Sequence, residues 1–123
     1  MLIKAESLAR TGKPREALPI LNLLRKNRIE NSTDLQVSDN DILKTVLEER
    51  RRELFCHGGL RLFDLKRLNR EEKFLKNIVR SFYDSENYQD TIVAIIKPNS
   101  PRYLMEIAPL ISNNNKDIKP NPR

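Results

Sequence analysis

The chain has 123 residues and a formal net charge of +6, 33% of its residues are charged, and it has no tryptophan. A chain of this length and composition builds one modest core at most. Its basic residues alternate with Asp and Glu along most of the length, which weakens a nucleic-acid-binding interpretation. The only cysteine, Cys56, excludes an internal disulfide and a multi-cysteine zinc site.

The beginning of the chain lacks the apolar segment of a secretory signal. No later stretch approaches the roughly 18 consecutive apolar residues that a membrane-spanning helix needs. A helical pattern is already under way at residue 2, and no capping residue precedes it. We therefore expect that an upstream part of the protein is missing from this sequence.

Two helices are predicted at the N-terminal end, over residues 2–11 and from about residue 14 to residue 28. Gly12, between them, suits a left-handed C-cap. Pro19 lacks the backbone N–H that a helix interior uses, so the second helix either begins regularly near Glu16 or kinks. The short turn predicts an antiparallel hairpin of the kind found in helical-repeat proteins.

The third predicted helix spans residues 41–57 and is rich in charge, with N-cap side chains supplied by residues 38–41. At 100° per residue, Arg50 falls near the centre of its apolar face. An unpaired guanidinium in an apolar interior costs several kcal/mol, so Arg50 needs a carboxylate or a set of backbone carbonyls as its partner. Glu53 and Asp64 are the nearest carboxylate candidates. The apolar residues that define this face are Ile42, Leu43, Val46, Leu47 and Leu54.

A short helix is predicted over residues 60–68, after Gly58 and Gly59. Its apolar side chains spread around the whole cylinder, so we expect other elements to enclose it. A buried or half-buried ionic network is expected to tie this helix to the charged helix over residues 41–57. Its members are Arg50, Glu53, Asp64 and Arg67.

A catalytic carboxylate pair is the alternative interpretation of this network, but it requires a cleft and raised pKa values. A guanidinium nearby, that of Arg50, would instead lower a carboxyl pKa, which suits a structural role. Cys56 and His57 are adjacent, so on a helix they point about 100° apart and form no thiolate pair, and further metal ligands are not suitably spaced. We therefore expect no catalytic residue, no metal site and no cofactor.

The basic residues between positions 66 and 80 are the best argument for a nucleic-acid partner. They follow helical spacing with Glu71 and Glu72 between them, which a solvated helix face also produces. No recognition motif accompanies them, so we expect no nucleic acid to bind. The set comprises Lys66, Arg67, Arg70, Lys73, Lys76 and Arg80.

The C-terminal part of the chain changes character. A weak helix is predicted over residues 73–83, and β-branched residues predict a short strand over residues 91–96. From Lys97 onward, prolines and an asparagine run predict an extended, irregular tail. We expect that tail to be held by packing of Tyr103, Leu104, Ile107 and Ile118.

The three tyrosines of the chain offer rings that could stack on sugars. Tyr83 and Tyr88 lie in a polar, loop-like stretch, where an exposed ring would be useful for binding, while Tyr103 lies in the tail. A role in the core or at its edge is the favoured expectation for these rings. They are therefore only secondary candidates for a ligand site.

Three stretches, in family order, resemble the SusD/RagB family of outer-membrane nutrient-binding lipoproteins. The first is similar to the family's last tetratricopeptide-like hairpin, the second to its signature stretch and the third to its closing tail. The chain departs from the family pattern at His57, Leu62, Glu106, Ala108 and Pro120. The matching residues are 5–12 with Ala17, Leu18, Leu24 and Arg25; 48–54 with 63–67; and 102–104 with Ile107 and 113–123.

The resemblance implies that residues 1–123 are a C-terminal portion of a SusD-like domain, because family members are several times longer. This portion would be mainly α and would comprise a tetratricopeptide-like hairpin over residues 1–29, signature helices over 41–80, and a short strand and packed tail over 91–123. The family's ligand-binding motifs match no numbered residue here, so no ligand-binding residue is predicted.

The resemblance also implies a nonenzymatic surface protein that captures oligosaccharides or another nutrient. It would deliver them to a SusC-like TonB-dependent transporter at the outer membrane. The lipid anchor of the family lies on an N-terminal cysteine that has no counterpart in this sequence. The alternative is a small helical protein-interaction module, with a basic nucleic-acid-binding module as its variant.

Overall fold

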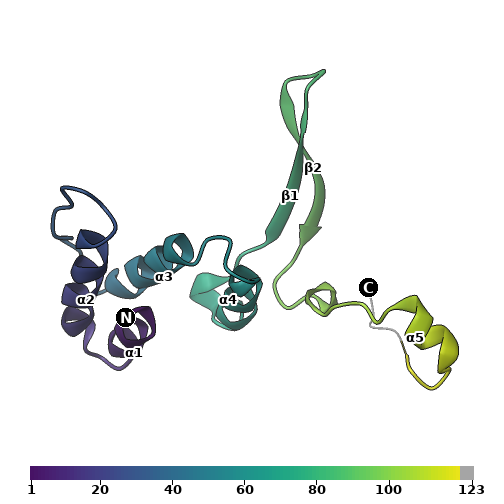
Figure 1. Ribbon diagram of the computed structural model, residues 1–123, viewed down its shortest axis with the longest axis horizontal. Helices are drawn as coiled ribbons and strands as arrows, with labels where there is room; N and C mark the ends of the chain where they lie inside the picture. The colour runs from purple at the N-terminus through teal and green to yellow at the C-terminus, as the bar shows by residue number, and fades with distance from the viewer. Residues whose placement is uncertain (120–123) are drawn as a thin grey trace. The chain divides into compact units, whose positions relative to one another are not determined.

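The computed structural model describes residues 1–119 and divides the chain into two compact units, Met1–Gly58 and a second that begins at Gly59. Helices make up 46% of the described residues, which also form one two-stranded sheet. The mainly α fold class expected from the sequence is therefore confirmed (Figure 1). No helix among residues 1–119 combines the length and apolar character that a membrane span requires.

The first unit contains α1 (Leu2–Arg10), α2 (Pro14–Lys26) and α3 (Ile42–Glu53). The turn between α1 and α2 places Gly12 at a φ of +79°, the left-handed conformation predicted for it. The second helix begins at Pro14 and continues through Pro19, so the alternative start near Glu16 is wrong. Pro19 is exposed, which places the missing hydrogen bond on the solvent side of the helix.

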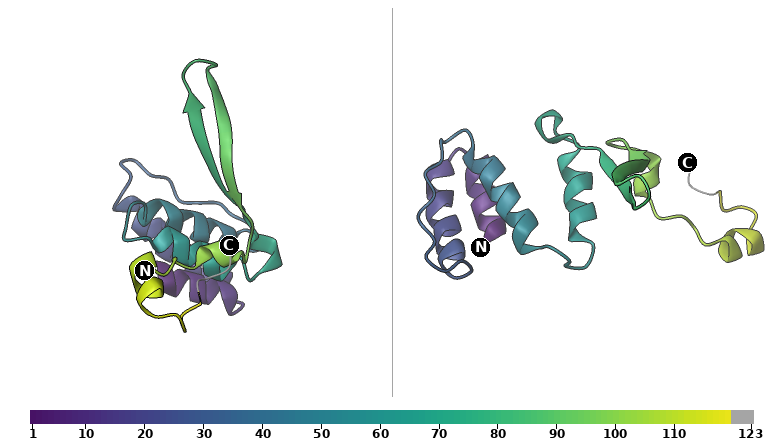
Figure 2. Two further views of the ribbon diagram at one scale, coloured as in Figure 1. Left: turned by 90° about the vertical axis from the view of Figure 1, so that its right-hand side faces the viewer. Right: turned by 90° about the horizontal axis from the view of Figure 1, so that it is seen from above.

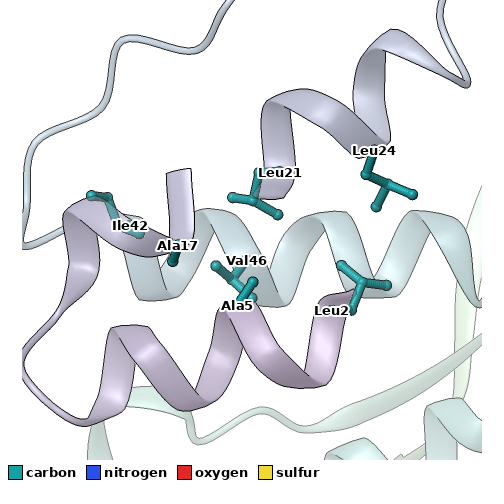
Figure 3. Packing of buried hydrophobic residues seen from close by; sticks show 7 residues of the cluster. All are labelled: Leu2, Ala5, Ala17, Leu21, Leu24, Ile42 and Val46. Carbon is teal, nitrogen blue, oxygen red and sulfur yellow. The ribbon is translucent and has the colours of Figure 1, made fainter. Parts of the chain in front are cut away.

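A cluster of buried apolar side chains joins the three helices of the first unit (Figure 3). The spacing of the buried residues within α2 and α3 is that of one helix face. Ala5 and Ala17 are completely buried, and their small side chains let α1 and α2 approach closely. The members of the cluster are Leu2, Ala5, Ala17, Leu21, Leu24, Ile42 and Val46.

The third helix ends at Glu53, earlier than the predicted end at residue 57. Leu54 leaves helical geometry, and Cys56 has a φ of +60°, a left-handed conformation that an L-residue helix cannot continue through. Gly58 and Gly59 follow with φ values of +44° and +74°. The break between the two units is therefore longer than the glycine pair alone.

The second unit begins with α4 (Leu60–Leu68), which confirms the helix predicted over these residues. The expectation that other elements enclose α4 on several sides is wrong for the described residues, because only Leu65 of the helix is buried while Leu62 and Phe63 are exposed. An apolar helix is enclosed only where other elements bring side chains to every side of it. Among the described residues of this unit, α4 is covered only on the side that carries Leu65.

A β-hairpin follows, formed by antiparallel strands β1 (Ile78–Asp84) and β2 (Gln89–Ile96), and Figure 2 shows its twist. The predicted strand over residues 91–96 is confirmed, whereas the helix predicted over residues 73–83 is wrong. Only a 3₁₀ turn, η1 (Glu72–Phe74), precedes β1. The β-branched and aromatic residues of β1 favour a strand once a partner such as β2 pairs with them.

The tail contains a 3₁₀ turn, η2 (Pro101–Tyr103), and a short helix, α5 (Pro109–Asn114), so the expectation of a wholly irregular tail is wrong. Pro109 occupies the first turn of α5, where a missing N–H is harmless. Of the four expected anchors, Tyr103 is buried, Ile107 and Ile118 are half-buried, and Leu104 is exposed. The last part of the expected tail motif, residues 120–123, lies outside the described residues.

Candidate functional site

Glu49 is one of two buried carboxylates in the first unit; the other, Glu6, has its Oε1 2.9 Å from Nε of Arg10 within α1. The Glu49 side chain is on the face of α3 that carries Ile42 and Val46, and the residue is 5% exposed. Its Oε2 accepts hydrogen bonds from Nη1 of Arg25 on α2, at 3.2 Å, and from Nη1 of Arg52, at 2.8 Å. Two guanidinium groups thus compensate one buried carboxylate, as burial of a charge requires.

A second ion pair joins Arg28, two residues beyond the end of α2, to Glu53, the last residue of α3. Nη2 and Nε of Arg28 lie 2.7 Å and 2.8 Å from Oε1 of Glu53. The hydrogen bond from Arg28 lowers the pKa of Glu53 and raises the pKa of the Arg28 guanidinium. Together with the Glu49 pairs, this contact forms the α2–α3 ion-pair cluster, which comprises Arg25, Arg28, Glu49, Arg52 and Glu53.

The four residues of the expected ionic network are divided between the two units. Arg50 and Glu53 lie in the first unit, and Asp64 and Arg67 lie in the second. Glu53 pairs with Arg28, whereas Nε of Arg67 lies 2.9 Å from Oδ1 of Asp64 within α4. Arg50 is half-buried. A network that ties α3 to α4 through all four side chains stays a prediction.

Glu49 and its partner on α2 were missed by reasoning from the sequence. The expected face included Leu43 and Leu47, which lie half-buried beside the buried stripe. Including them turned the centre of the face by one residue, from Glu49 to Arg50, about 100° around the helix. The signal that identifies the buried stripe is the 4-3-4 spacing of Ile42, Val46, Glu49 and Glu53.

A buried amide organises the second unit. Asn69 follows α4 and is 1% exposed. Its Nδ2 donates to the hydroxyl of Tyr103 at 3.0 Å and to the carbonyl of Lys76 at 3.2 Å, while its Oδ1 accepts from the N–H of Lys76 at 2.8 Å. The Asn99 side chain donates to the Asn69 carbonyl at 3.2 Å. The end of α4, the approach to β1 and the tail therefore meet at one side chain.

The tyrosines divide into two classes. Tyr103 is buried and bonded to Asn69, so its ring serves the fold. Tyr83 and Tyr88 are 56% and 79% exposed on the hairpin, so the expectation of a role in the core or at its edge is wrong for these two rings. Tyr83 lies on β1 and Tyr88 in the connecting turn, immediately before β2. These two rings are the ones available to a ligand among the three tyrosines.

The basic residues between positions 66 and 80 do not share one helix face. Lys66 and Arg67 belong to α4, Lys73 lies in η1, and Arg80 is on β1. The Nζ of Lys73 sits 4.9 Å from the ring centroid of Phe74. Because the helix ends at Leu68, the helical spacing of the set has no structural counterpart.

Cys56 is exposed and lies beyond the end of α3. Among residues 1–119, no group of three or more His, Cys, Asp and Glu side chains is placed to hold a metal ion. The structure thus contributes an ion-pair cluster, a buried amide and an exposed hairpin as the features from which a site would be built.

Comparison with known proteins gives one result. The sequence matches the family model described as the SusD family over residues 1–123. No curated protein and no solved structure matches it. The family match includes both units, from α1 to the tail.

Proposed function

The chain belongs to the SusD family, and we propose from this membership that it takes part in binding a nutrient for uptake through a SusC-like transporter. The observation that carries the proposal is the family match over residues 1–123. The proposed nutrient is an oligosaccharide. Exposed aromatic rings beside hydrogen-bonding side chains, as on the hairpin, have the chemistry that recognises sugars.

The proposed activity is binding without chemical change to the ligand, so no residue is assigned a catalytic role. Family membership supports this proposal. The carboxylates and guanidinium groups of the α2–α3 ion-pair cluster are occupied with one another. Their arrangement supports a structural role, because a nearby guanidinium favours the ionised carboxylate over a general acid.

The proposed location is the outer membrane, with a lipid anchor on the full-length protein and a SusC-like TonB-dependent transporter as partner. We further propose that α1 and α2 are the last tetratricopeptide-like hairpin of a longer domain. The two helices are connected by a short turn, and their buried alanines allow close packing, as helical repeats require.

The test is a binding screen of the full chain against an array of plant, microbial and host oligosaccharides, with double-stranded DNA at physiological salt as a comparison probe. We expect saturable binding to at least one oligosaccharide and no binding to DNA. Binding to DNA alone would replace the proposal with the basic-module alternative. Failure to bind any oligosaccharide on the array would overturn the assignment of ligand binding to this chain.

A further inference from the structure

The turn of the hairpin is fixed by one carboxylate. Oδ1 of Asp84 accepts the backbone N–H groups of Glu86 and Asn87 at 2.9 Å and 3.4 Å, and Oδ2 accepts the side-chain amide of Asn87 at 2.7 Å. These hydrogen bonds hold the pKa of Asp84 below its usual range. The turn between β1 and β2 therefore has a defined conformation, which fixes the position of the residues that follow it.

Tyr88 ends this turn in a conformation that its side chain does not favour. Its φ is +53°, in the left-handed region that glycine and asparagine adopt at lower cost. Its side chain is 79% exposed, so burial gives little in return. Neither the backbone geometry nor packing accounts for a tyrosine at this position.

The chemical composition of the end of the hairpin is unusual for this chain. We define residues 82–90 as the aromatic tip. It contains three aromatic residues, and its other six side chains all carry carboxylate, amide or hydroxyl groups, without an aliphatic or basic residue. Its three carboxylates contrast with the +6 net charge of the whole chain. The sequence of the tip is Phe82, Tyr83, Asp84, Ser85, Glu86, Asn87, Tyr88, Gln89 and Asp90.

Tyr83 and Asp90 lie directly opposite each other in the register of the hairpin. Cross-strand neighbours share one face of a sheet, so a ring and a carboxylate stand side by side there. Further from the tip, aliphatic side chains occupy the strands, with Val79 opposite Ile95. The change from aliphatic to aromatic and hydrogen-bonding side chains occurs within one short ribbon.

We propose that the aromatic tip is a contact site for a neutral oligosaccharide, with Tyr83 and Tyr88 as stacking surfaces and Asp90 as acceptor for a sugar hydroxyl. This inference rests on the proposed function and names the place on this chain that meets the ligand. The C–H face of a sugar ring packs on an aromatic face, and its hydroxyl groups need carboxylate or amide partners.

The charge of the aromatic tip selects among possible occupants. Three carboxylates repel uronic acids, sulfated sugars and nucleic-acid phosphates, which require positive potential. A surface for a protein partner would be expected to present apolar anchors with few carboxylates at its centre. The tip shares the aromatic rings of such a surface, but it places three carboxylates among them. A neutral sugar fits both the rings and the carboxylates, because it stacks on the rings and carries no negative charge.

The experiment uses the full chain and a printed array that contains matched neutral and uronic-acid oligosaccharides. The tightest-binding neutral oligosaccharide is then titrated while tyrosine fluorescence is recorded, a direct probe because the chain has no tryptophan. The variants are Tyr83→Ala, Tyr88→Gly and, as a control, Phe55→Ala. Phe55 is an exposed ring of the first unit, 77% exposed. Amide hydrogen exchange of β1 and β2 reports whether each variant keeps the hairpin.

We expect Tyr83→Ala and Tyr88→Gly each to weaken binding about tenfold or more, and Phe55→Ala to leave it unchanged. Tyr88→Gly is the sharper variant, because it removes the ring while relieving the backbone, so the hairpin should be at least as protected from exchange. Weakened binding with an intact hairpin supports the proposal.

Two results overturn the inference while the proposed function stands. They are binding by both tip variants as tight as that of the unchanged chain, and preference for uronic-acid oligosaccharides over neutral ones. Absence of binding to every oligosaccharide on the array overturns both the proposed function of this chain and the inference. The failure of one is thereby distinguished from the failure of the other.

Discussion

In the unit formed by Met1–Gly58, three helices share a cluster of apolar side chains, whereas in the unit that begins at Gly59 the most deeply buried side chain is the amide of Asn69. The first unit follows the usual route of burying amphipathic faces. The second joins its segments through hydrogen bonds to one residue, while Phe63, Phe82 and Ile92 stay exposed. The two units are therefore stabilised in different ways, the first by apolar burial and the second by hydrogen bonds to a buried amide.

The largest expected effect concerns apolar burial in the first unit. Leu21 is completely buried in the cluster, so Leu21→Ala should lower the free energy of unfolding of the first unit by about 2–5 kcal/mol, through lost burial and the cavity left behind. Chemical denaturation followed by circular dichroism measures it. Leu23→Ala, on the same helix but 54% exposed, is the control and should cost under about 0.5 kcal/mol. Equal losses would show that the cluster is not the core.

The next effect concerns the hydrogen bonds of the buried amide in the second unit. Asn69→Ala leaves the Lys76 backbone and the Tyr103 hydroxyl without their buried partner, at a cost of about 1–3 kcal/mol. Hydrogen exchange at the Lys76 amide should accelerate, and the α2 amides should keep their protection. Asn77→Ala, at an exposed position nearby, is the matched control. Unchanged exchange at Lys76 in Asn69→Ala would contradict the role given to the amide.

A smaller loss of stability is expected when the buried carboxylate of Glu49 in the first unit is neutralised. Glu49→Gln keeps the shape of the side chain but removes the charge that compensates Arg25 and Arg52, and should cost about 1–2 kcal/mol. Glu48→Gln is the control, because Glu48 is exposed and meets Arg52 only at 3.7 Å, so its loss should stay under about 0.5 kcal/mol. Denaturation midpoints compare the two. A larger loss for Glu48 would place the buried stripe of α3 elsewhere.

The smallest effect is one of pH. The hydrogen bond from Arg28 holds the pKa of Glu53 below its ordinary value of 4.5, so ionised Glu53 stabilises the fold above that pH. The contribution is lost as the pH falls from 4.5 towards the folded pKa. Glu53→Gln should therefore show a shallower loss of stability over this range, measured as denaturation midpoints at successive pH values. Glu30→Gln, at an exposed position of the same unit, is the control.

The helices and the family were accessible to reasoning from the sequence, because both depend on local pattern. The apolar spacing of α1 to α4 and the positions of Gly12 and Pro14 specify helices without reference to distant residues. The ordered motifs likewise pointed to the family that the whole-chain match then showed. Within α1 to α4 the structure differs from the prediction at the helix ends, as at Glu53, where a left-handed Cys56 breaks the pattern.

Pairing between distant residues decided the rest. β1 is a strand because Ile78 meets Ile96 and Tyr83 meets Asp90 across the hairpin, whereas its residues alone also suited a weak helix. Arg25 on α2 marks Glu49 rather than Arg50 as the buried charge of α3. Asn69 and Tyr103 meet across 34 positions of sequence, a contact that no local pattern announces. Sequence periodicity fixes which face of an element is apolar, but only the neighbouring element decides which side chain on that face is buried, paired or left exposed.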